Sequence, residues 1–442
     1  MRRRELLAGA FAALGASALR AAEAMPGWSD ALQREARAIL DGAASEGLDP
    51  ADYREGPVEA AFARYLHDLH LGRVRARDLG FGVTVPLQDG ALVAQALQEA
   101  VAAGRLASAV ERLTPALAQY RQLREMLARY RRIAAGPLPA GNDPVALRTR
   151  LLAFGDLAAD ADVLDDGVKR FQQRHGLGAD GVIGRATLAA LAVPPARRVR
   201  QIELAMERLR WLPQRSGRPV IAINIPMFRL WAWDGAAAES APSLAMDVIV
   251  GKAVRTQTPV FADEMTHLIF RPYWNVPRSI LVNEVLPAME RDPGYLARHD
   301  MEMVPGAEGG APRVRQRPGP KNSLGLVKFI FPNDADVYLH GTPARELFAR
   351  SRRDFSHGCV RVADPPTLAQ WLLKDQPTWT REAIEAAMNG TRTQQVNLSA
   401  PVPVLLYYLT ALVSPDDGLL HFADDLYGHD AALERRLAAR RR

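Results

Sequence analysis

The 442-residue chain contains a single cysteine, which excludes an internal disulfide framework. Beyond its first residues it has no apolar run long enough to cross a bilayer, and it has no long low-complexity tract. The formal net charge is only +6, and the one dense basic run is "ERRLAARRR" at the C-terminus, so a nucleic-acid partner is not expected. What remains is a globular protein of 48% hydrophobic residues that is too long for one ordinary domain.

The first 24 residues, "MRRRELLAGAFAALGASALRAAEA", predict a secretory signal peptide. Three arginines precede an apolar stretch at residues 6–19, and Ala22-Glu23-Ala24 fits a small-x-small cleavage site. Arg3 and Arg4 before two leucines give this segment twin-arginine character. We therefore expect a periplasmic protein without a transmembrane segment in its mature chain, with an uncleaved amphipathic anchor as the alternative.

Residues 25–141 are rich in Ala, Leu, Glu and Arg, and they predict a helical scaffold domain. Tyr120, Leu123, Leu127 and Tyr130 recur at spacings of three and four, which indicates one apolar helix face. Thr114 before Pro115 predicts the start of that helix. His67 and His70 also have a helical spacing, but they lack further ligands nearby, so a packing or surface role is expected and no metal site.

Residues 142–195 predict a small helical module. Val168, Phe171 and His175 share a helix face that Gly176 would end. The patterns V-x-x-F-Q-x-x-H-G-L and D-G-V-I-G-x-x-T-L-x-A-L resemble the peptidoglycan-binding domain 1 family. The resemblance implies contact with cell-wall polymer. A helical spacer that no longer binds anything is the alternative.

From residue 217 to 393 the sequence changes to short strands such as "PVIAINIP" and "SLAMDVIVG", separated by Gly and Pro. A helical stretch and a polar loop interrupt the strands at residues 272–318, and an excursion of this length predicts a functional insertion such as a lid. Residues 394–442 are left as a C-terminal extension. The predicted fold class is multi-domain α+β.

The lone cysteine, Cys359, lies in "SHGCVRV" at residues 356–362, with "HGT" 19 residues upstream. His340 or His357 would activate the thiol, and the backbone N–H groups of Gly358 and Cys359 would form an oxyanion hole. Ser356 would orient a histidine or donate to substrate, and the Arg361 guanidinium suits a substrate carboxylate. The alternatives are an inert core thiol or a Cys-His-His metal site, which lacks a convincing fourth ligand.

The arrangement H-G-T, spacer, S-H-G-C-x-R resembles the catalytic motif of the L,D-transpeptidases of the YkuD type. Neighbouring segments such as "PYWNVPRSI" and "GPKNSLGLVKFIFPN" resemble the large periplasmic subgroup, which joins a helical scaffold, a wall-binding module and a catalytic domain with a helical capping insertion. The resemblance implies Cys359 as nucleophile, His340 as base and acid, and the main-chain carbonyl of Gly341 as third member. It places His357, Gly358 and Ser356 at the oxyanion side and Arg361 at the carboxylates of the substrate.

The reaction that the resemblance implies is acyl transfer without a cofactor. Cys359 would attack a tetrapeptide stem of peptidoglycan and release D-Ala, and an amine of a neighbouring stem would resolve the thioester as a 3→3 cross-link. Water or a lipoprotein amine would instead give a carboxypeptidase or an anchoring transferase. A wall-binding protein without catalysis is the alternative of a different class. The expected partners are stem peptides and other cell-wall synthesis proteins.

Overall fold

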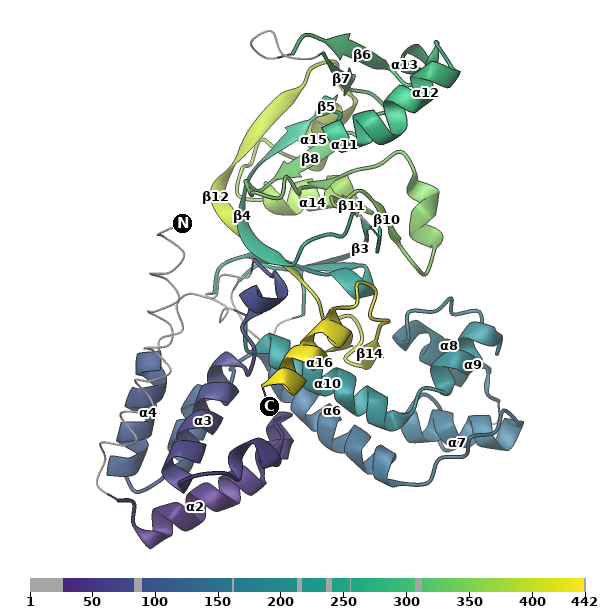
Figure 1. The fold of residues 1–442 in the computed structure, drawn as a ribbon. Coiled ribbons are helices and arrows are strands. Elements are labelled where there is room, and N and C mark those ends of the chain that lie inside the picture. Colours follow the sequence, from purple (N-terminus) through teal and green to yellow (C-terminus); the bar gives the residue numbers. More distant parts are fainter. Residues whose placement is uncertain are drawn as a thin grey trace. The chain divides into compact units, whose positions relative to one another are not determined.

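The computed structural model describes residues 27–82, 90–160, 163–212, 217–235, 241–254, 256–306 and 312–440, so the predicted signal peptide lies outside the described residues. The chain divides into two compact units (Figure 1). The helical unit comprises the described residues of Met1–Gly217 and Tyr408–Arg442, and the β-rich unit comprises those of Arg218–Ala236 and Ser240–Tyr407. Within the described ranges, no helix is both long and apolar enough to cross a membrane.

The helical unit is built mainly from amphipathic helices and one short hairpin. Its α-helices are α2 (Asp30–Asp41), α3 (Val58–Leu71), α4 (Gly90–Ala102), α5 (Ala107–Leu113), α6 (Ala118–Ala135), α7 (Pro144–Phe154), α8 (Asp165–Arg174), α9 (Arg185–Leu191), α10 (Pro195–Leu209) and α16 (His429–Ala439). Its 3₁₀ turns are η1 (Ala43–Glu46), η2 (Pro50–Tyr53) and η3 (Ala76–Leu79), and its hairpin strands are β13 (Ala411–Val413) and β14 (Leu420–Phe422).

Two helix predictions are confirmed and one is wrong. The apolar stripe of α6 is buried at all four predicted positions. Gly176 follows the C-cap of α8 with φ of +64°, a conformation that glycine adopts without steric cost. Thr114, however, ends α5 rather than starting α6, because its hydroxyl donates to the Val110 carbonyl oxygen at 2.7 Å.

The C-terminal residues belong to the helical unit through buried polar contacts. Arg208 of α10 pairs with Asp430 of α16 at 2.6 Å, and both side chains are almost fully buried. Gln201 donates to the Ala423 carbonyl oxygen at 3.0 Å. A buried pair of this kind is costly to break, because the remaining partner is left as an uncompensated charge. The tail is therefore an integral part of this unit.

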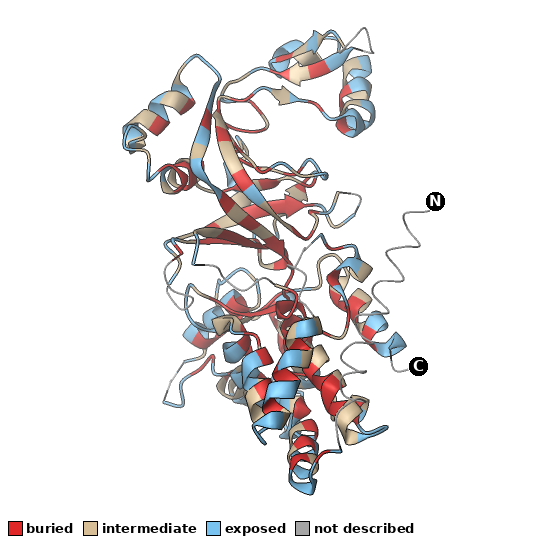
Figure 2. Ribbon diagram, turned by 90° about the vertical axis from the view of Figure 1, so that its left-hand side faces the viewer, coloured by how far each residue is buried: buried red, intermediate tan, exposed pale blue. Residues whose placement is uncertain are grey.

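The β-rich unit is organised by a nine-stranded mixed sheet with strand order β10-β3-β11-β9-β8-β4-β12-β1-β2. Because β2 also pairs with β3, the sheet closes on itself. The strands are β1 (Val220–Asn224), β2 (Arg229–Trp233), β3 (Leu244–Gly251), β4 (Phe261–Phe270), β8 (Val327–Ile330), β9 (Leu339–His340), β10 (Asp354–Ser356), β11 (Val360–Val362) and β12 (Gln394–Tyr407). Figure 2 shows the buried residues concentrated in these strands and on one side of many helices.

The boundary predicted at residue 393 differs from the structure. β12 lies inside the sheet, parallel to β1 and antiparallel to β4, so residues 394–407 are part of the β-rich unit. The remaining elements outside the insertion are η4 (Ile225–Met227), η7 (Arg345–Ala349), α14 (Pro365–Leu372) and α15 (Arg381–Asn389). Asp364 caps α14 and Thr380 caps α15 by accepting backbone N–H bonds.

The insertion at residues 272–318, here called the cap, has its own small core, and it is not purely helical as predicted. Its elements are β5 (Trp274–Asn275), α11 (Arg278–Ile280), the π-helix η5 (Leu281–Val285), α12 (Leu286–Arg291), α13 (Tyr295–Arg298), β6 (Met301–Val304) and β7 (Arg313–Gln316). The three strands form a separate sheet in the order β5-β7-β6. Val276, Val285 and Val314 are buried between this sheet and the helices.

Candidate active site

Three neighbouring strands bring the candidate catalytic residues to one face of the sheet. Lys328 on β8 is the register partner of His340 on β9, and His340 is the register partner of Arg361 on β11. Side chains of paired residues point to the same face, as do side chains two residues apart on one strand. Tyr338 and Cys359 directly precede β9 and β11, and Lys328 Nζ lies 3.6 Å from the centroid of the Tyr338 ring. The positive charge of Lys328 acts on both the Cys359 thiol and the His340 imidazole.

The loop before β11 is held by side-chain hydroxyls. Ser356 donates to the Cys359 carbonyl oxygen at 2.5 Å and accepts the Gly358 N–H at 3.2 Å. Thr258 donates to the Gly358 carbonyl oxygen at 2.8 Å. Gly358 has φ of +115°, a conformation that a residue with a side chain would adopt only under strain. The sequence pattern S-H-G-C is therefore needed locally to present Cys359 at the end of a sharp turn.

These contacts change the predicted oxyanion hole. The Gly358 N–H is already bonded to the Ser356 hydroxyl, so it is not free to bind a substrate oxygen in this conformation. Within the described chain, the N–H of Cys359 has no hydrogen-bond acceptor, which makes it the better backbone donor. The Ser356 hydroxyl bonds to Cys359 and Gly358 of its own loop rather than to a histidine.

His340 is buried, and its ring Nδ1 lies 2.5 Å from the carbonyl oxygen of Gly341. A carbonyl can only accept, so Nδ1 carries the proton and Nε2 is left as a lone-pair acceptor. Burial, followed by the positive charges of Arg361 and Lys328, lowers the pKa of His340 to about 3. The imidazole is therefore neutral at neutral pH and able to accept a proton.

Cys359 is protonated in the resting site. Burial raises the pKa of its thiol, against the opposing effects of Tyr338 and the Lys328 charge. The sulfur lies 3.7 Å from the Asp336 carbonyl oxygen, which accepts a bond from a thiol but would repel a thiolate. The resting site thus holds a neutral thiol and a neutral imidazole rather than an ion pair.

Arg361 lies half-buried next to His340. Burial lowers the pKa of its guanidinium, and the nearby Cys359 and Glu346 oppose that effect. Its Nε is a buried donor without an acceptor in the described part of the chain. An unpaired buried donor is costly, so a substrate oxygen that reached it would be favourable.

His357 does not face the sheet residues. Its Nε2 lies 2.7 Å from Glu284 Oε1, and Glu284 belongs to the π-helix η5 of the cap. A single π-helical turn shifts the side chains that follow it, and such turns are frequent at functional sites. The structure therefore makes His357 a contact between the cysteine loop and the cap, a role that the sequence did not indicate.

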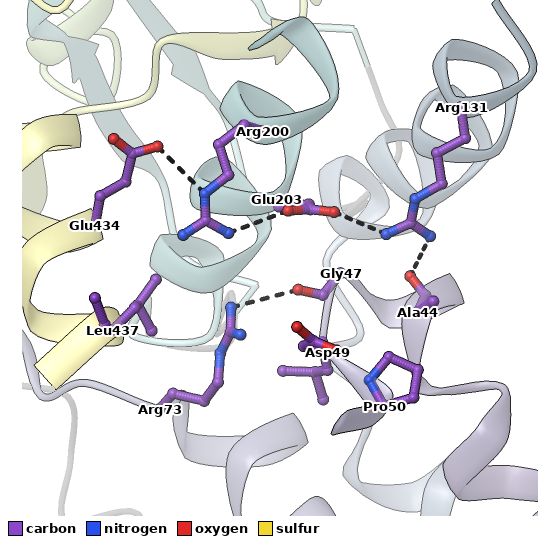
Figure 3. Close-up of a pocket in the computed structure, with 12 residues that line it drawn as sticks. Ala44, Gly47, Asp49, Pro50, Arg73, Arg131, Arg200, Glu203, Glu434 and Leu437 are labelled. Atoms are coloured by element: carbon purple, nitrogen blue, oxygen red, sulfur yellow. Dashed lines mark hydrogen bonds and ion pairs between the residues drawn. The ribbon is translucent and has the colours of Figure 1, made fainter. Parts of the chain in front are cut away.

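A cavity of about 290 Å³ lies in the helical unit and contains none of the candidate site residues. Figure 3 shows Arg131 and Arg200 both directed at Glu203, at 2.8 and 3.1 Å, with Arg200 also bonded to Glu434. The guanidinium groups are thus already engaged by carboxylates, and the cavity has little charge left to offer a ligand.

His67 and His70 contact Asp68 and the Leu113 carbonyl oxygen, and no cluster able to hold a metal occurs among the described residues.

Three family models match the chain. Residues 218–395 match the L,D-transpeptidase catalytic domain of the YkuD family, residues 20–127 match a scaffold domain, and residues 140–191 match a "Putative peptidoglycan binding domain". The two resemblances that the sequence motifs indicated are therefore confirmed, as is the multi-domain α+β class.

One curated relative, from Haemophilus influenzae, is described as a "Putative L,D-transpeptidase". It is 33% identical over 246 residues, which are 52% of this chain and 48% of the relative, so the chain spans about half the length of that protein. The solved catalytic domain of an E. faecium L,D-transpeptidase is 17% identical, with a TM-score of 0.20 over 43% of this chain and 98% of that domain. That structural likeness is too low to support an argument.

Proposed function

We propose that this chain, which carries an L,D-transpeptidase catalytic domain at residues 218–395, transfers peptidoglycan stem peptides through a thioester on Cys359. The observation that supports the proposal is the position of neutral His340 on β9 as the register partner of Arg361 on β11, with Cys359 directly before β11, inside the matched domain. The peptidoglycan-binding module at residues 140–191 supports cell-wall polymer as the substrate class. Export to the periplasm by way of residues 1–24, by the twin-arginine route, belongs to the same proposal.

The acylation step uses the two neutral groups in sequence. His340 Nε2 takes the thiol proton as the sulfur attacks the carbonyl carbon of the amide before the terminal D-Ala of a tetrapeptide stem. The Cys359 N–H donates to the oxygen that becomes negative. The C–N bond then breaks, the proton on Nε2 passes to the leaving amine, and a thioester remains on Cys359.

The second step returns the enzyme to its starting state. The amine of a neighbouring stem attacks the thioester, His340 accepts a proton from it, and the thiol is regenerated as the 3→3 amide forms. Gly341 holds His340 through its carbonyl oxygen, which fixes the tautomer throughout. Arg361, with its unpaired Nε, is placed to bind a carboxylate of the stem.

Product analysis tests this proposal directly. Purified protein is incubated with tetrapeptide-rich sacculi, which are then digested with a muramidase and analysed by mass spectrometry. We expect 3→3 dimers together with free D-Ala. Tripeptides alone would indicate an L,D-carboxypeptidase, transfer to an added lipoprotein amine would indicate an anchoring enzyme, and wall binding without any product would indicate a non-catalytic protein.

The contact between Glu284 and His357 predicts a change in how the thioester is resolved. Glu284→Ala removes a bond that helps keep the cap against the cysteine loop, so water should reach the thioester more often. Because Glu284 is about half exposed, the bond stabilises this arrangement by at most about 1 kcal/mol. We expect the ratio of tripeptide to 3→3 dimer to rise by up to about fivefold, measured in the same sacculus assay.

Glu290→Ala is the matched control, because Glu290 is an exposed residue of the same insertion. It should leave the product ratio unchanged. An unchanged ratio in Glu284→Ala as well would show that this contact does not control access of water.

A further inference from the structure

Lys328 occupies a position that packing alone does not explain. It is partly buried on β8, and no carboxylate of the described residues lies within ion-pair distance of its ammonium. Burial lowers its pKa, while Cys359 and Asp336 act in the opposite direction. Burying an ammonium without an ion-pair partner costs free energy unless another interaction compensates for it.

Tyr338 connects this ammonium to the candidate nucleophile. Lys328 Nζ lies 3.6 Å from the centroid of the Tyr338 ring, a distance at which the ring face attracts a cation. The Tyr338 backbone N–H and, to a smaller extent, the Tyr338 hydroxyl both act on the Cys359 sulfur and oppose the rise in the pKa of its thiol that burial causes. Lys328, Tyr338 and Cys359 therefore form a continuous cluster: ammonium, aromatic ring and hydroxyl, sulfur.

The turn before β9 gives the sulfur two different neighbours. Asp336 has φ of +52°, a conformation that residues other than glycine seldom adopt, and it presents its carbonyl oxygen to the sulfur. Asn333 holds this turn by bonding to both the N–H and the carbonyl oxygen of Val337. A protonated thiol can donate to the Asp336 carbonyl, whereas a thiolate needs donors, and Tyr338 offers both its backbone N–H and its hydroxyl.

We propose that Tyr338 and Lys328 stabilise the thiolate of Cys359. When the thiol proton leaves for His340 Nε2, the Tyr338 hydroxyl donates its hydrogen bond to the negative sulfur, and the Lys328 ammonium balances the charge from the far side of the ring. Tyr338 touches the reacting atom and is a catalytic residue. Lys328 is a positioning residue that acts through its charge and through Tyr338.

The surrounding charges support this division of roles. Lys328 on β8, Tyr338 just before β9, Asp336 in the preceding turn and Arg361 on β11 all interact with Cys359. His340 interacts with the charges of Arg361 and Lys328. The two cations favour the thiolate and disfavour an imidazolium at His340. The two cations therefore lower the free energy needed to form the thiolate. They also keep His340 from retaining the transferred proton, which must pass on to the leaving amine.

The thiol titration of the intact protein tests the proposal. Cys359 is the only cysteine, so iodoacetamide alkylation followed by intact mass reports on it alone. The alkylation rate is measured from about pH 6 to 10.5 for wild type, Lys328→Met, Lys328→Arg and Tyr338→Phe. The midpoint should rise by about one pH unit in Lys328→Met and Tyr338→Phe, and Lys328→Arg should restore the wild-type midpoint.

Lys374→Met is the matched control, because Lys374 also lies over an aromatic ring, that of Trp371, at 5.2 Å. It should titrate like wild type. Tyr338→Phe keeps the ring and loses only the hydroxyl, so it carries the test even if Lys328→Met does not fold. A Tyr338→Phe midpoint equal to that of wild type would overturn the role of the hydroxyl, and equal midpoints in all variants would overturn the proposal.

The catalytic meaning of this cluster rests on the proposed function, and the two fail separately. The resemblance to the L,D-transpeptidases implies that a carbapenem acylates Cys359, so this adduct on the wild type reports on acyl transfer. The titration reports on the sulfur whatever its substrate. Shifted midpoints without any carbapenem adduct would retain the thiolate role and reject the transferase. An adduct with unshifted midpoints would do the reverse.

Discussion

Replacing Cys359 with alanine is expected to abolish both the covalent adduct with a carbapenem and the formation of 3→3 dimers. The Cys359 thiol is partly exposed on the sharp turn before β11, and the chain has no second thiol to replace it. Loss of a nucleophile that forms a covalent intermediate typically costs about 10⁴-fold or more in rate. Intact-protein mass spectrometry after mixing with a carbapenem should show one added mass on wild type and none on the variant.

Two controls make this result interpretable. Ser351→Ala alters an exposed residue of the segment leading to the cysteine loop and should acylate like wild type. Thermal unfolding of Cys359→Ala should match that of the wild type within a few degrees, because the side chain is small and partly exposed. An adduct of equal yield on Cys359→Ala would refute the nucleophile.

The helical unit was largely predictable because its information is local. The stripe of α6 and the end of α8 depend on residues three and four positions apart, and a sequence shows these spacings directly. Thr114 was misassigned because a threonine followed by proline suits either side of a helix boundary. Only the tertiary fold shows that its hydroxyl bonds back to Val110.

The sheet was less predictable because its pairings are distant in sequence. β12 starts after residue 393 but lies between β1 and β4, which come more than 120 residues earlier. No local pattern records that neighbour relation, so the strand was assigned to an extension. The hairpin β13–β14 and the helix α16 lie near the C-terminus but belong to the helical unit, most of which comes from the first half of the chain. No local pattern in the sequence shows this membership either.

The site residues that lie in short motifs were predictable from the sequence, and those that depend on strand pairing were not. The motif around Cys359 and His340 indicated the candidate pair, because both lie in short recognisable segments. Tyr338 and Lys328 were missed, since their importance depends on the register between β8 and β9. His357 was assigned to the oxyanion side from the family resemblance, whereas in the structure its ring bonds to Glu284.

Replacing His340 with glutamine is expected to slow carbapenem acylation by about 10²- to 10⁴-fold, the range that a general base contributes. Glutamine keeps a neutral polar side chain of similar length but cannot accept and release the thiol proton. The size of the loss is measured as the second-order rate constant of adduct formation, followed by mass spectrometry. His267→Gln is the control, because His267 lies on β4 of the same sheet and contacts Thr266.

The pH dependence of this rate separates base catalysis from a preformed thiolate. Burial lowers the pKa of His340 to about 3 and raises the pKa of Cys359 above its usual value, so both groups are neutral around neutral pH. The wild-type rate should therefore be nearly constant from about pH 5 to 8, because neither partner changes its protonation there. In His340→Gln only the thiolate reacts, and the rate should rise about tenfold per pH unit below the thiol pKa. A wild-type profile that falls below about pH 6.5 would mean that the imidazole titrates like an exposed histidine, and the neutral-pair mechanism would then be wrong.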